Sequence, residues 1–367
     1  MSVISDRVAS LTADRSRVSA AVLLLVVTVA VAVVTGGVPL TLGLGVVAGA
    51  IAISLPPAAR RYLARRVIGI AGSLLIAMWL VWLLAHNLPD RSRQDATGVV
   101  ASTKRFVAWL GDLVGGDLGR AQYSESVWEG ISRTLPLSLQ LPLYSQVLAF
   151  AIAVPGALVA ARYRGRLSDI GIRAIGLLGL AAPIIIVGPI LVFTLAVGEL
   201  GLFGIEVGWK ILPAGRYVPV GDGVWEHARS MFLPSVTLAV TTLATYLVLL
   251  RTEIIHQLQQ DHALLALAKG IGPRHLVRRH GLRPAMPAVV ALSAAQTGAI
   301  IGNMILVERI FTLPGFGDYV VVAIGRRDIV AVAGAIFVAA LVVAVINVVA
   351  EAVLLVVDPR IADRENQ

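Results

Sequence analysis

Long apolar runs recur along the whole 367-residue chain and limit the folds open to it. A helix needs roughly 20 residues to cross a bilayer core about 30 Å thick. Six stretches of about this scale are predicted as core spans, near 67–87, 135–160, 174–198, 233–250, 287–308 and 329–357. Only 14% of the residues are charged, whereas a soluble domain usually has about a quarter. We therefore predict an all-α polytopic membrane protein.

A further apolar stretch, 18–59, precedes these spans and is too long for a single one. Its centre, Thr35-Gly36-Gly37-Val38-Pro39, is a turn signal. We expect a tight hairpin of two short helices, roughly 18–35 and 39–56. A cleaved signal peptide is the alternative, because a basic segment precedes the apolar run. The run continues well beyond a signal-peptide core, which disfavours that alternative.

The Lys and Arg residues predict the orientation of the chain. With a cytoplasmic N-terminus and eight spans, 19 of the 31 basic residues fall in cytoplasmic segments, as the positive-inside rule favours. The firmest marker is the cluster Arg60-Arg61-Tyr62-Leu63-Ala64-Arg65-Arg66, which must face inward. The net charge of +9 is therefore mostly a topology signal, and it gives no support to nucleic-acid binding. We expect a bacterial cytoplasmic (inner) membrane protein with both termini in the cytoplasm.

The chain lacks sequence patterns of catalysis. No phosphate-binding loop and no His-Glu-x-x-His pattern occurs, and there is no Cys. The six histidines are expected to be solvated residues in loops or at span ends, so we predict no catalytic, metal or cofactor-binding residues. Among the predicted spans, Glu308 and Glu351 are the exceptions to a nearly uncharged interior, and each lies near a span end. This disfavours an ion-coupled transporter, and we expect energy for transport to come from another subunit.

The longest predicted inner loop, 251–287, carries the strongest local signal. Asp261 is placed to cap a short helix, 262–269, by accepting a backbone N–H. Lys269 lies in the last turn, where a cation complements the helix dipole. Gly270 fits the following position, which favours a positive φ. These residues predict a structured loop.

A second helix is predicted to begin at Pro273, after Gly272. The first helix carries the run Ala263-Leu264-Leu265-Ala266-Leu267-Ala268, which is apolar nearly all round. An exposed helix of this composition needs a cover. Either it packs against its own spans, or it inserts into a groove on a partner, where small Ala side chains allow close approach. Composition alone favours neither.

Several motifs in a fixed order resemble one family. They are Arg61-Tyr62-Leu63-Ala64-Arg65-Arg66, Gly116-Asp117-Leu118-Gly119, Asp261 to Gly270, Arg279-His280-Gly281-Leu282-Arg283-Pro284-Ala285-Met286-Pro287, Val307 to Gly317, Arg327-Asp328 and Asp358-Pro359-Arg360-Ile361. This series resembles the permeases of ABC importers, and most closely the oligopeptide/dipeptide (and nickel) permease family. The resemblance covers about residues 60–362, and it identifies the loop 251–287 with the cytoplasmic EAA coupling loop.

Three departures from the family pattern stand out. Leu264 and Leu267 occupy positions where the family usually has arginines, and His262 one where it has a tyrosine-type residue. The end of the loop is one residue shorter than the usual Arg-Asn-Ala-Leu-x-Pro. The hairpin 18–56 has no counterpart in the six-span pattern.

The resemblance implies a type I importer permease fold with six core spans plus the N-terminal hairpin. It implies a second homologous permease, two ATPase subunits or domains, and an extracytoplasmic substrate-binding protein as partners. The expected ATPase-coupling residues are Asp261, Ala263, Leu264, Leu265, Ala266, Leu267, Ala268, Lys269 and Gly270. The expected outer gate comprises Glu308, Phe311, Pro314, Gly315, Phe316 and Gly317. As the alternative, this segment is a structural turn that buries Phe311 and Phe316, and Glu308 pairs with Arg309 or Arg327.

The predicted organisation has five parts. They are a cytoplasmic tail 1–17, the hairpin 18–59, a first core span with an external loop 60–134, a permease core 135–357 and a cytoplasmic tail 358–367. The outer loops 88–134 and 199–232 are expected to hold short helices. One of them, 103–114, carries Phe106, Val107, Leu110 and Leu113 at helical spacing. Trp79, Trp82 and Trp109 are expected to mark packing or interfaces.

The predicted function is that of a non-catalytic permease subunit that forms half of the pathway for di- or oligopeptides. Three alternatives stay open: a permease for nickel or another small solute, a stand-alone secondary transporter, and a membrane enzyme. Transport by the chain alone, without an ATPase, would distinguish the secondary transporter from the importer subunit.

Overall fold

The computed structural model describes residues 68–69, 72–73, 75–83, 98–114, 117–121, 126–197, 200–202, 205–207, 212–213, 215 and 217–357. The expected hairpin 18–56, the basic cluster that follows it and the motif at Asp358 lie outside these residues. The chain divides into two compact units. Unit 1 comprises Met1–Pro136 and Tyr319–Gln367, and unit 2 comprises Leu137–Asp318.

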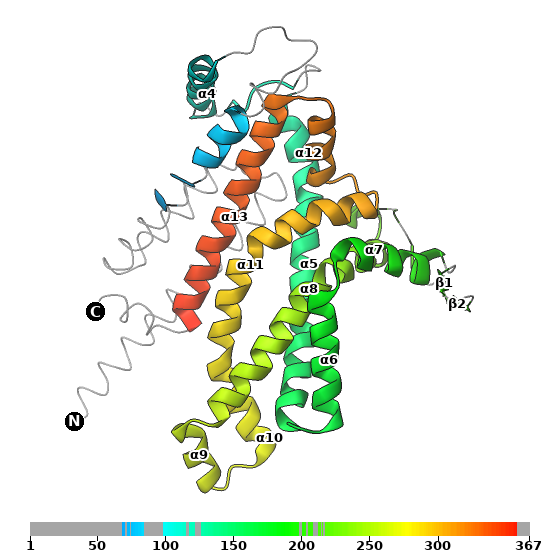
Figure 1. Cartoon of the computed structure of the whole chain (residues 1–367), viewed down its shortest axis with the longest axis vertical. Helices are drawn as coiled ribbons and strands as arrows, with labels where there is room; N and C mark the ends of the chain where they lie inside the picture. Colours follow the sequence, from blue (N-terminus) through cyan, green and yellow to red (C-terminus); the bar gives the residue numbers. More distant parts are fainter. Residues whose placement is uncertain are drawn as a thin grey trace, which may run out of the picture. The chain divides into compact units, whose positions relative to one another are not determined.

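Helices make up nearly all of the described structure (Figure 1). They are α4 Val99–Val114, α5 Val127–Arg162, α6 Leu167–Ala181, α7 Ile184–Val192, α8 Val224–Leu258, α9 Asp261–Ala268, α10 Pro273–His275, α11 Arg283–Ile310, α12 Phe316–Gly325 and α13 Ile329–Val357. Two π-helical segments, η1 Phe193–Val197 and η3 Leu276–Leu282, and a 3₁₀ turn, η2 Val220–Asp222, complete them. The predicted all-α class is confirmed.

Four described helical segments are long and apolar enough to cross a membrane: Val127–Arg162, Val224–Leu258, Pro273–Ile310 and Ile329–Asn347. A fifth span is possible if α6 and α7 count together, but they meet at 107°. The segment expected as a span at 174–198 is therefore divided between two helices that meet at a sharp bend. Pro183 explains the break, because it has no N–H to donate and disfavours helical backbone at Ala182, whose ψ is 112°.

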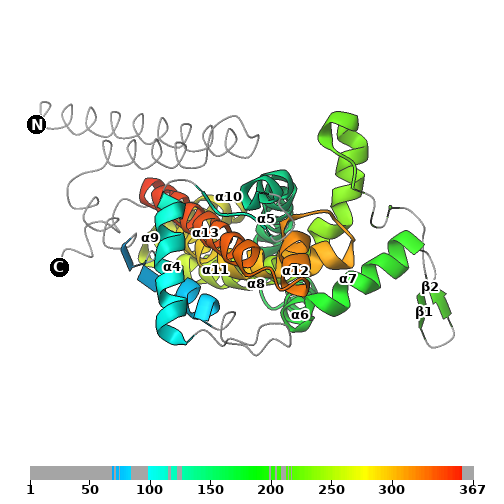
Figure 2. The ribbon, with the colours of Figure 1, turned by 90° about the horizontal axis from the view of Figure 1, so that it is seen from above.

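The segment 199–232, predicted to be an outer loop with short helices, also has a different structure. Strands β1 Leu200–Leu202 and β2 Ile205–Val207 form an antiparallel hairpin, which lies beyond the far end of α7 (Figure 2). Helix α8 already begins at Val224, so most of the final third of that loop is helical. The segment 199–232 thus contains strands as well as helix, whereas its length had suggested only short helices.

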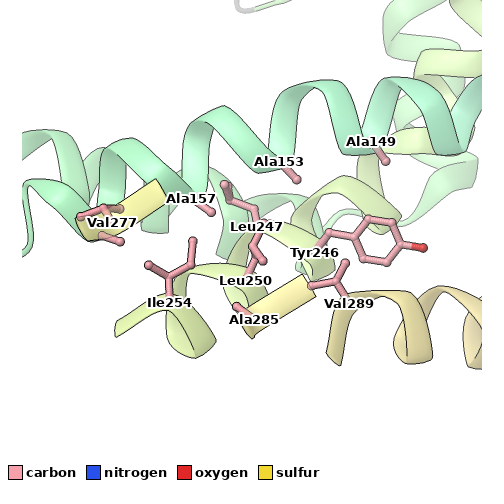
Figure 3. Packing of buried hydrophobic residues seen from close by; sticks show 11 residues of the cluster. Ala149, Ala153, Ala157, Tyr246, Leu247, Leu250, Ile254, Val277, Ala285 and Val289 are labelled. Atoms are coloured by element: carbon pink, nitrogen blue, oxygen red, sulfur yellow. The ribbon is translucent and has the colours of Figure 1, made fainter. Parts of the chain in front are cut away.

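Small residues on α5 build the core of unit 2. Ala149, Ala153, Ala157 and Ala161 recur at every fourth position and are buried. They belong to one buried cluster with Tyr246, Leu247, Leu250 and Ile254 of α8. Figure 3 shows Ala149, Ala153 and Ala157 on the side of α5 that faces these residues. Small side chains at this spacing let two helices approach closely. Helix α8 also contacts α6, α7 and α11, so it is the central helix of this unit.

In unit 1, α4 confirms the helix expected at 103–114. Its buried aromatic side chains are Phe106 and Trp109, which pack with each other and with Trp82 at ring-centroid distances of 5.5–6.1 Å. Val107, expected on the apolar face, is 60% exposed. Trp82 and Trp109 thus serve packing, as predicted.

Candidate functional site

The coupling loop 251–287 contains α9, whose C-terminal end is closed by Gly270. This residue has φ +80°, and its N–H donates to the Leu267 carbonyl at 2.9 Å. The next N–H, of Ile271, donates to the Ala266 carbonyl at 3.2 Å. This pair of bonds satisfies carbonyls that a helix end leaves free. The positive φ expected at Gly270 is confirmed.

The N-terminal end of α9 differs from its prediction by one residue. Gln260 is the N-cap, and no side chain caps it. Its carbonyl accepts the N–H groups of Ala263 at 3.0 Å and Leu264 at 3.2 Å, so the helix starts one residue earlier than expected. Asp261 is the first helical residue instead of the cap. Its carboxylate still lies at the helix end where negative charge is favourable.

The two faces of α9 have different surroundings. Ala263 and Ala266 lie three residues apart, hence on one face, and they are only 1% and 5% exposed. Helix α9 contacts α8 and η3, so these alanines pack against the chain itself. Leu264, Leu265 and Leu267 are 53%, 58% and 54% exposed. We call these three residues the leucine face.

The coupling loop is attached firmly to α8. A Cβ atom on Gly281 would meet Ile254 Cγ2 at 3.0 Å and Leu258 Cγ at 3.3 Å, so η3 lies directly on α8. His262 Nε2–H donates to the carbonyl of His280 at 3.3 Å. Pro273 stands in the first turn of α10, as predicted. The loop therefore holds α9 in a defined position at the end of unit 2 where α5 and α6 also meet (Figure 1).

At the C-terminal end of α11, Glu308 is completely buried. Its carboxylate accepts the hydroxyl of Ser138 at 2.5 Å and the N–H groups of Gly317 at 2.7 Å and Asp318 at 3.3 Å. Ser138 Oγ in turn accepts the N–H of Phe316 at 2.6 Å. These are the first N–H groups of α12, which its own backbone cannot satisfy. We call these five residues the Glu308 network.

Two glycines make room for this carboxylate. A Cβ atom on Gly315 would overlap the carboxyl group of Glu308. A Cβ atom on Gly317 would lie 2.7 Å from Ile305 Cα, so the helix backbone itself would have to shift. The motif Pro314-Gly315-Phe316-Gly317 thus lets a turn close over a buried acid.

The pairing expected between Glu308 and an arginine is wrong. Arg309 donates to Asp318 at 2.6 Å in an ion pair with exposed side chains. Adjacent helical residues point in different directions, which directs Glu308 inward to hydrogen-bond donors and Arg309 outward.

The turn after α11 buries its large side chains. Phe311, Leu313 and Phe316 are 1–2% exposed, whereas Pro314 is exposed. The structural alternative for this segment is therefore confirmed as far as Phe311 and Phe316 are concerned. A gating role is not tested by this packing and stays a prediction.

Sequence reasoning missed buried polar residues of unit 2, among them Ser138 and Asp169. Ser138 stands in an apolar run and has no sequence signal. Asp169 is 1% exposed and receives two hydrogen bonds from Arg251, at 2.6 and 2.8 Å. A carboxylate beside an arginine-rich turn was the signal that could have revealed it.

His227 also corrects an expectation, because it is buried and not solvated. Its Nδ1–H donates to the Val218 carbonyl at 2.7 Å. Nε2 then accepts the hydroxyl of Tyr144 at 3.1 Å. Within the described part of the chain, no group of three or more His, Cys, Asp or Glu residues is arranged to hold a metal ion.

Comparison with known proteins identifies the family. Residues 153–363 match the family described as binding-protein-dependent transport system inner membrane component. A Brucella suis protein named a peptide transport system permease is 32% identical over 69% of this chain and 78% of its own length. The oligopeptide transport system permease AppB of Bacillus subtilis is 30% identical over 70% of this chain and 79% of its own.

A third relative matches over a longer range. The glutathione transport system permease GsiC of Escherichia coli K12 is 28% identical over 82% of this chain and 98% of its own length. The family match over residues 153–363 includes the coupling loop and Glu308, and the resemblance noted in the sequence motifs is confirmed. This multi-pass membrane chain belongs to the inner-membrane permease family of binding-protein-dependent ABC importers.

Proposed function

We propose that this chain is one permease subunit of an ATP-driven importer, and that it forms half of a pathway for di- or oligopeptides. The names of the relatives supply the substrate class. The observation that carries the mechanism is the leucine face, because it exposes three large apolar side chains on a loop that is otherwise firmly packed. An apolar surface of this kind needs a partner to cover it.

The coupling surface is assigned to α9 and its cap. Leu264, Leu265 and Leu267 insert into a groove of an ATPase, while Ala263 and Ala266 anchor the helix to α8 and η3. Asp261, Ala268, Lys269 and Gly270 complete the surface, and all four are exposed. Leu264 and Leu267 stand where the family usually has arginine, so the contact with the ATPase is more apolar than in most relatives.

The outer mouth is assigned to the turn that follows α11. The Glu308 network positions this turn, and Glu308 acts on α12 without touching the substrate. Phe311, Pro314, Gly315, Phe316 and Gly317 give the turn its rigid shape. The burial of Phe311, Gly315, Phe316 and Gly317 supports a positioning role for the turn.

The assembly comprises a second, homologous permease, two ATPase subunits or domains and an extracytoplasmic binding protein. The chain resides in the bacterial cytoplasmic membrane with both termini inside. The permease core is 135–357 with the coupling loop 251–287. The tails 1–17 and 358–367, the hairpin 18–59 and the segment 60–134 complete the proposed organisation.

Reconstitution in proteoliposomes tests this function. The complete transporter is expected to accumulate a labelled dipeptide only when ATP, both ATPases and the binding protein are present. Uptake by this chain alone, without ATPase or ATP, would contradict the proposal and identify a secondary transporter.

The substrate class is tested in the same vesicles. Unlabelled di- and oligopeptides are expected to compete with the labelled peptide, and glutathione is included because one relative is named for it. Competition by nickel but by no peptide would replace the peptide assignment with the metal alternative.

A further inference from the structure

A cavity of about 400 Å³ lies at the end of unit 2 that carries the coupling loop, beside the turn between α5 and α6. We place it at a membrane boundary, because the candidate span Val127–Arg162 ends at this turn. Its volume falls in the range of small-ligand sites. The residues that line it are Arg164, Gly165, Asp169, Arg173, Arg251, Thr252 and Ile255.

The floor of the cavity is rigid. Arg251 Nε and one of its terminal nitrogens donate to both oxygens of Asp169, at 2.6 and 2.8 Å. The side chains are only 15% and 2% exposed. Gly165 N–H donates to the same carboxylate at 2.9 Å, which ties the turn to α6. A paired carboxylate and guanidinium in this geometry hold the position of Arg251.

The charge of the cavity is positive. Three arginines and one aspartate line it, and the aspartate is already paired with Arg251. Arg164 and Arg173 line it and are exposed, so their positive charge is accessible to a ligand. Guanidinium groups bind phosphate oxygens well because their N–H donors match the geometry of a phosphate.

Helix α6, which supplies Asp169 and Arg173 to the cavity, also carries exposed apolar side chains. Leu167 and Ile170 of α6 are 86% and 54% exposed, and further along the helix so are Ile175, Leu177 and Leu178, at 56–69%. In a protein that crosses the membrane, such a face meets acyl chains. A basic pocket directly beside a lipid-facing helix is the arrangement that recognises an anionic headgroup.

We propose that this cavity binds the phosphate headgroup of an anionic glycerophospholipid, with its acyl chains lying along the exposed face of α6. Arg164 and Arg173 contact the phosphate, and Arg251 forms the fixed floor of the site. A free phosphate would use the charges but not the apolar face, and for that reason a lipid is the ligand that fits both. The assignment requires only that α5 and α6 meet at a membrane surface, so it is independent of the cargo that the transporter carries.

The full-length chain, purified in detergent, tests the proposal by native mass spectrometry. Phosphatidylglycerol and phosphatidylcholine with identical acyl chains are added in parallel. We expect retained phosphatidylglycerol adducts, and we expect the double variant Arg164→Gln/Arg173→Gln to weaken their binding about tenfold. Circular dichroism and the unfolding midpoint establish that this variant is folded.

The matched control removes two arginines from the same turn. Arg162 and Arg166 stack on the Tyr163 ring, at 5.2 and 5.7 Å from its centroid, and neither lines the cavity. Arg162→Gln/Arg166→Gln has the same net charge as the test variant and is expected to bind the lipid within about twofold of the unaltered chain. Equal losses in both variants would show a diffuse charge effect and would overturn the proposal.

Two further outcomes would also overturn it. Phosphatidylcholine that binds as well as phosphatidylglycerol would show that the headgroup charge is not recognised. Inorganic phosphate that displaces phosphatidylglycerol at millimolar concentration would identify a free anion as the ligand. Insensitivity to phosphate, together with loss of binding only in the Arg164/Arg173 variant, supports the lipid site.

Discussion

Gly315 lies so near the buried carboxylate of Glu308 that an added Cβ atom would overlap it. We predict that Gly315→Ala destabilises the full-length chain by about 1–3 kcal/mol, because the added methyl group overpacks this turn. Gly298→Ala is the matched control, since a Cβ atom there meets nothing within 4 Å. Unfolding midpoints in detergent measure the difference. Equal midpoints for the two variants would contradict the proposed close packing.

Gly270 is a second glycine with a specific requirement, but here the requirement is backbone conformation. Its φ of +80° strains any side chain, although the space around it is open. We predict that Gly270→Val costs about 1–3 kcal/mol locally and impairs ATP-driven uptake, because the cap of α9 is lost. Gly272→Val is the control, at φ −64°. Unimpaired uptake by Gly270→Val would contradict the role of this cap.

Residues whose role is local were predictable, and residues whose role depends on distant partners were not. Gly270 and Pro273 could be placed because helix ends impose their own preferences on the neighbouring sequence. Ser138 could not be placed, because its partner Glu308 is 170 positions away. The partners of Glu308 were unpredictable for the same reason. The sequence suggested an ion pair with an arginine, whereas the fold supplies the Ser138 hydroxyl and backbone N–H groups.

At the scale of the element, α9 joins an anchored face to an exposed one. We predict that Leu264→Ser/Leu267→Ser abolishes co-purification of the ATPase without lowering the unfolding midpoint, because both side chains are more than half exposed. Val107→Ser, which removes an apolar side chain that is 60% exposed on α4, should leave co-purification unchanged. Retention of the ATPase by the double variant would exclude the leucine face as the contact.

Hydropathy located most of the spans but not their internal breaks. The positions of α5, α8 and α13 follow from long apolar runs, because burial in lipid depends on the sum over many residues. The bend between α6 and α7 depends on one proline, Pro183. Hydropathy averaged over a span does not register it. The β-hairpin after α7 was missed for a related reason, because its strands are only three residues long.

At the scale of the whole molecule, the absence of cysteine gives a direct test of orientation. Val220→Cys and Leu265→Cys each introduce a single thiol at an exposed position, 46% and 58% exposed in the unaltered chain. In spheroplasts that express this chain without its partners, a membrane-impermeant maleimide should label V220C at once. It should label L265C only after permeabilisation. The reverse pattern would contradict the predicted topology.

The Glu308 network also has a consequence for the order in which the protein is made. Ser138 leaves the ribosome 170 residues before Glu308, which is a delay of roughly 10–35 s at bacterial synthesis rates. Helices α5 to α8 must therefore enter the bilayer before the contact that closes unit 2 exists. A nascent chain that stops short of α11 leaves Ser138 without its carboxylate. The hydrogen bond between Ser138 and Glu308 can therefore form only after α11 has been synthesised.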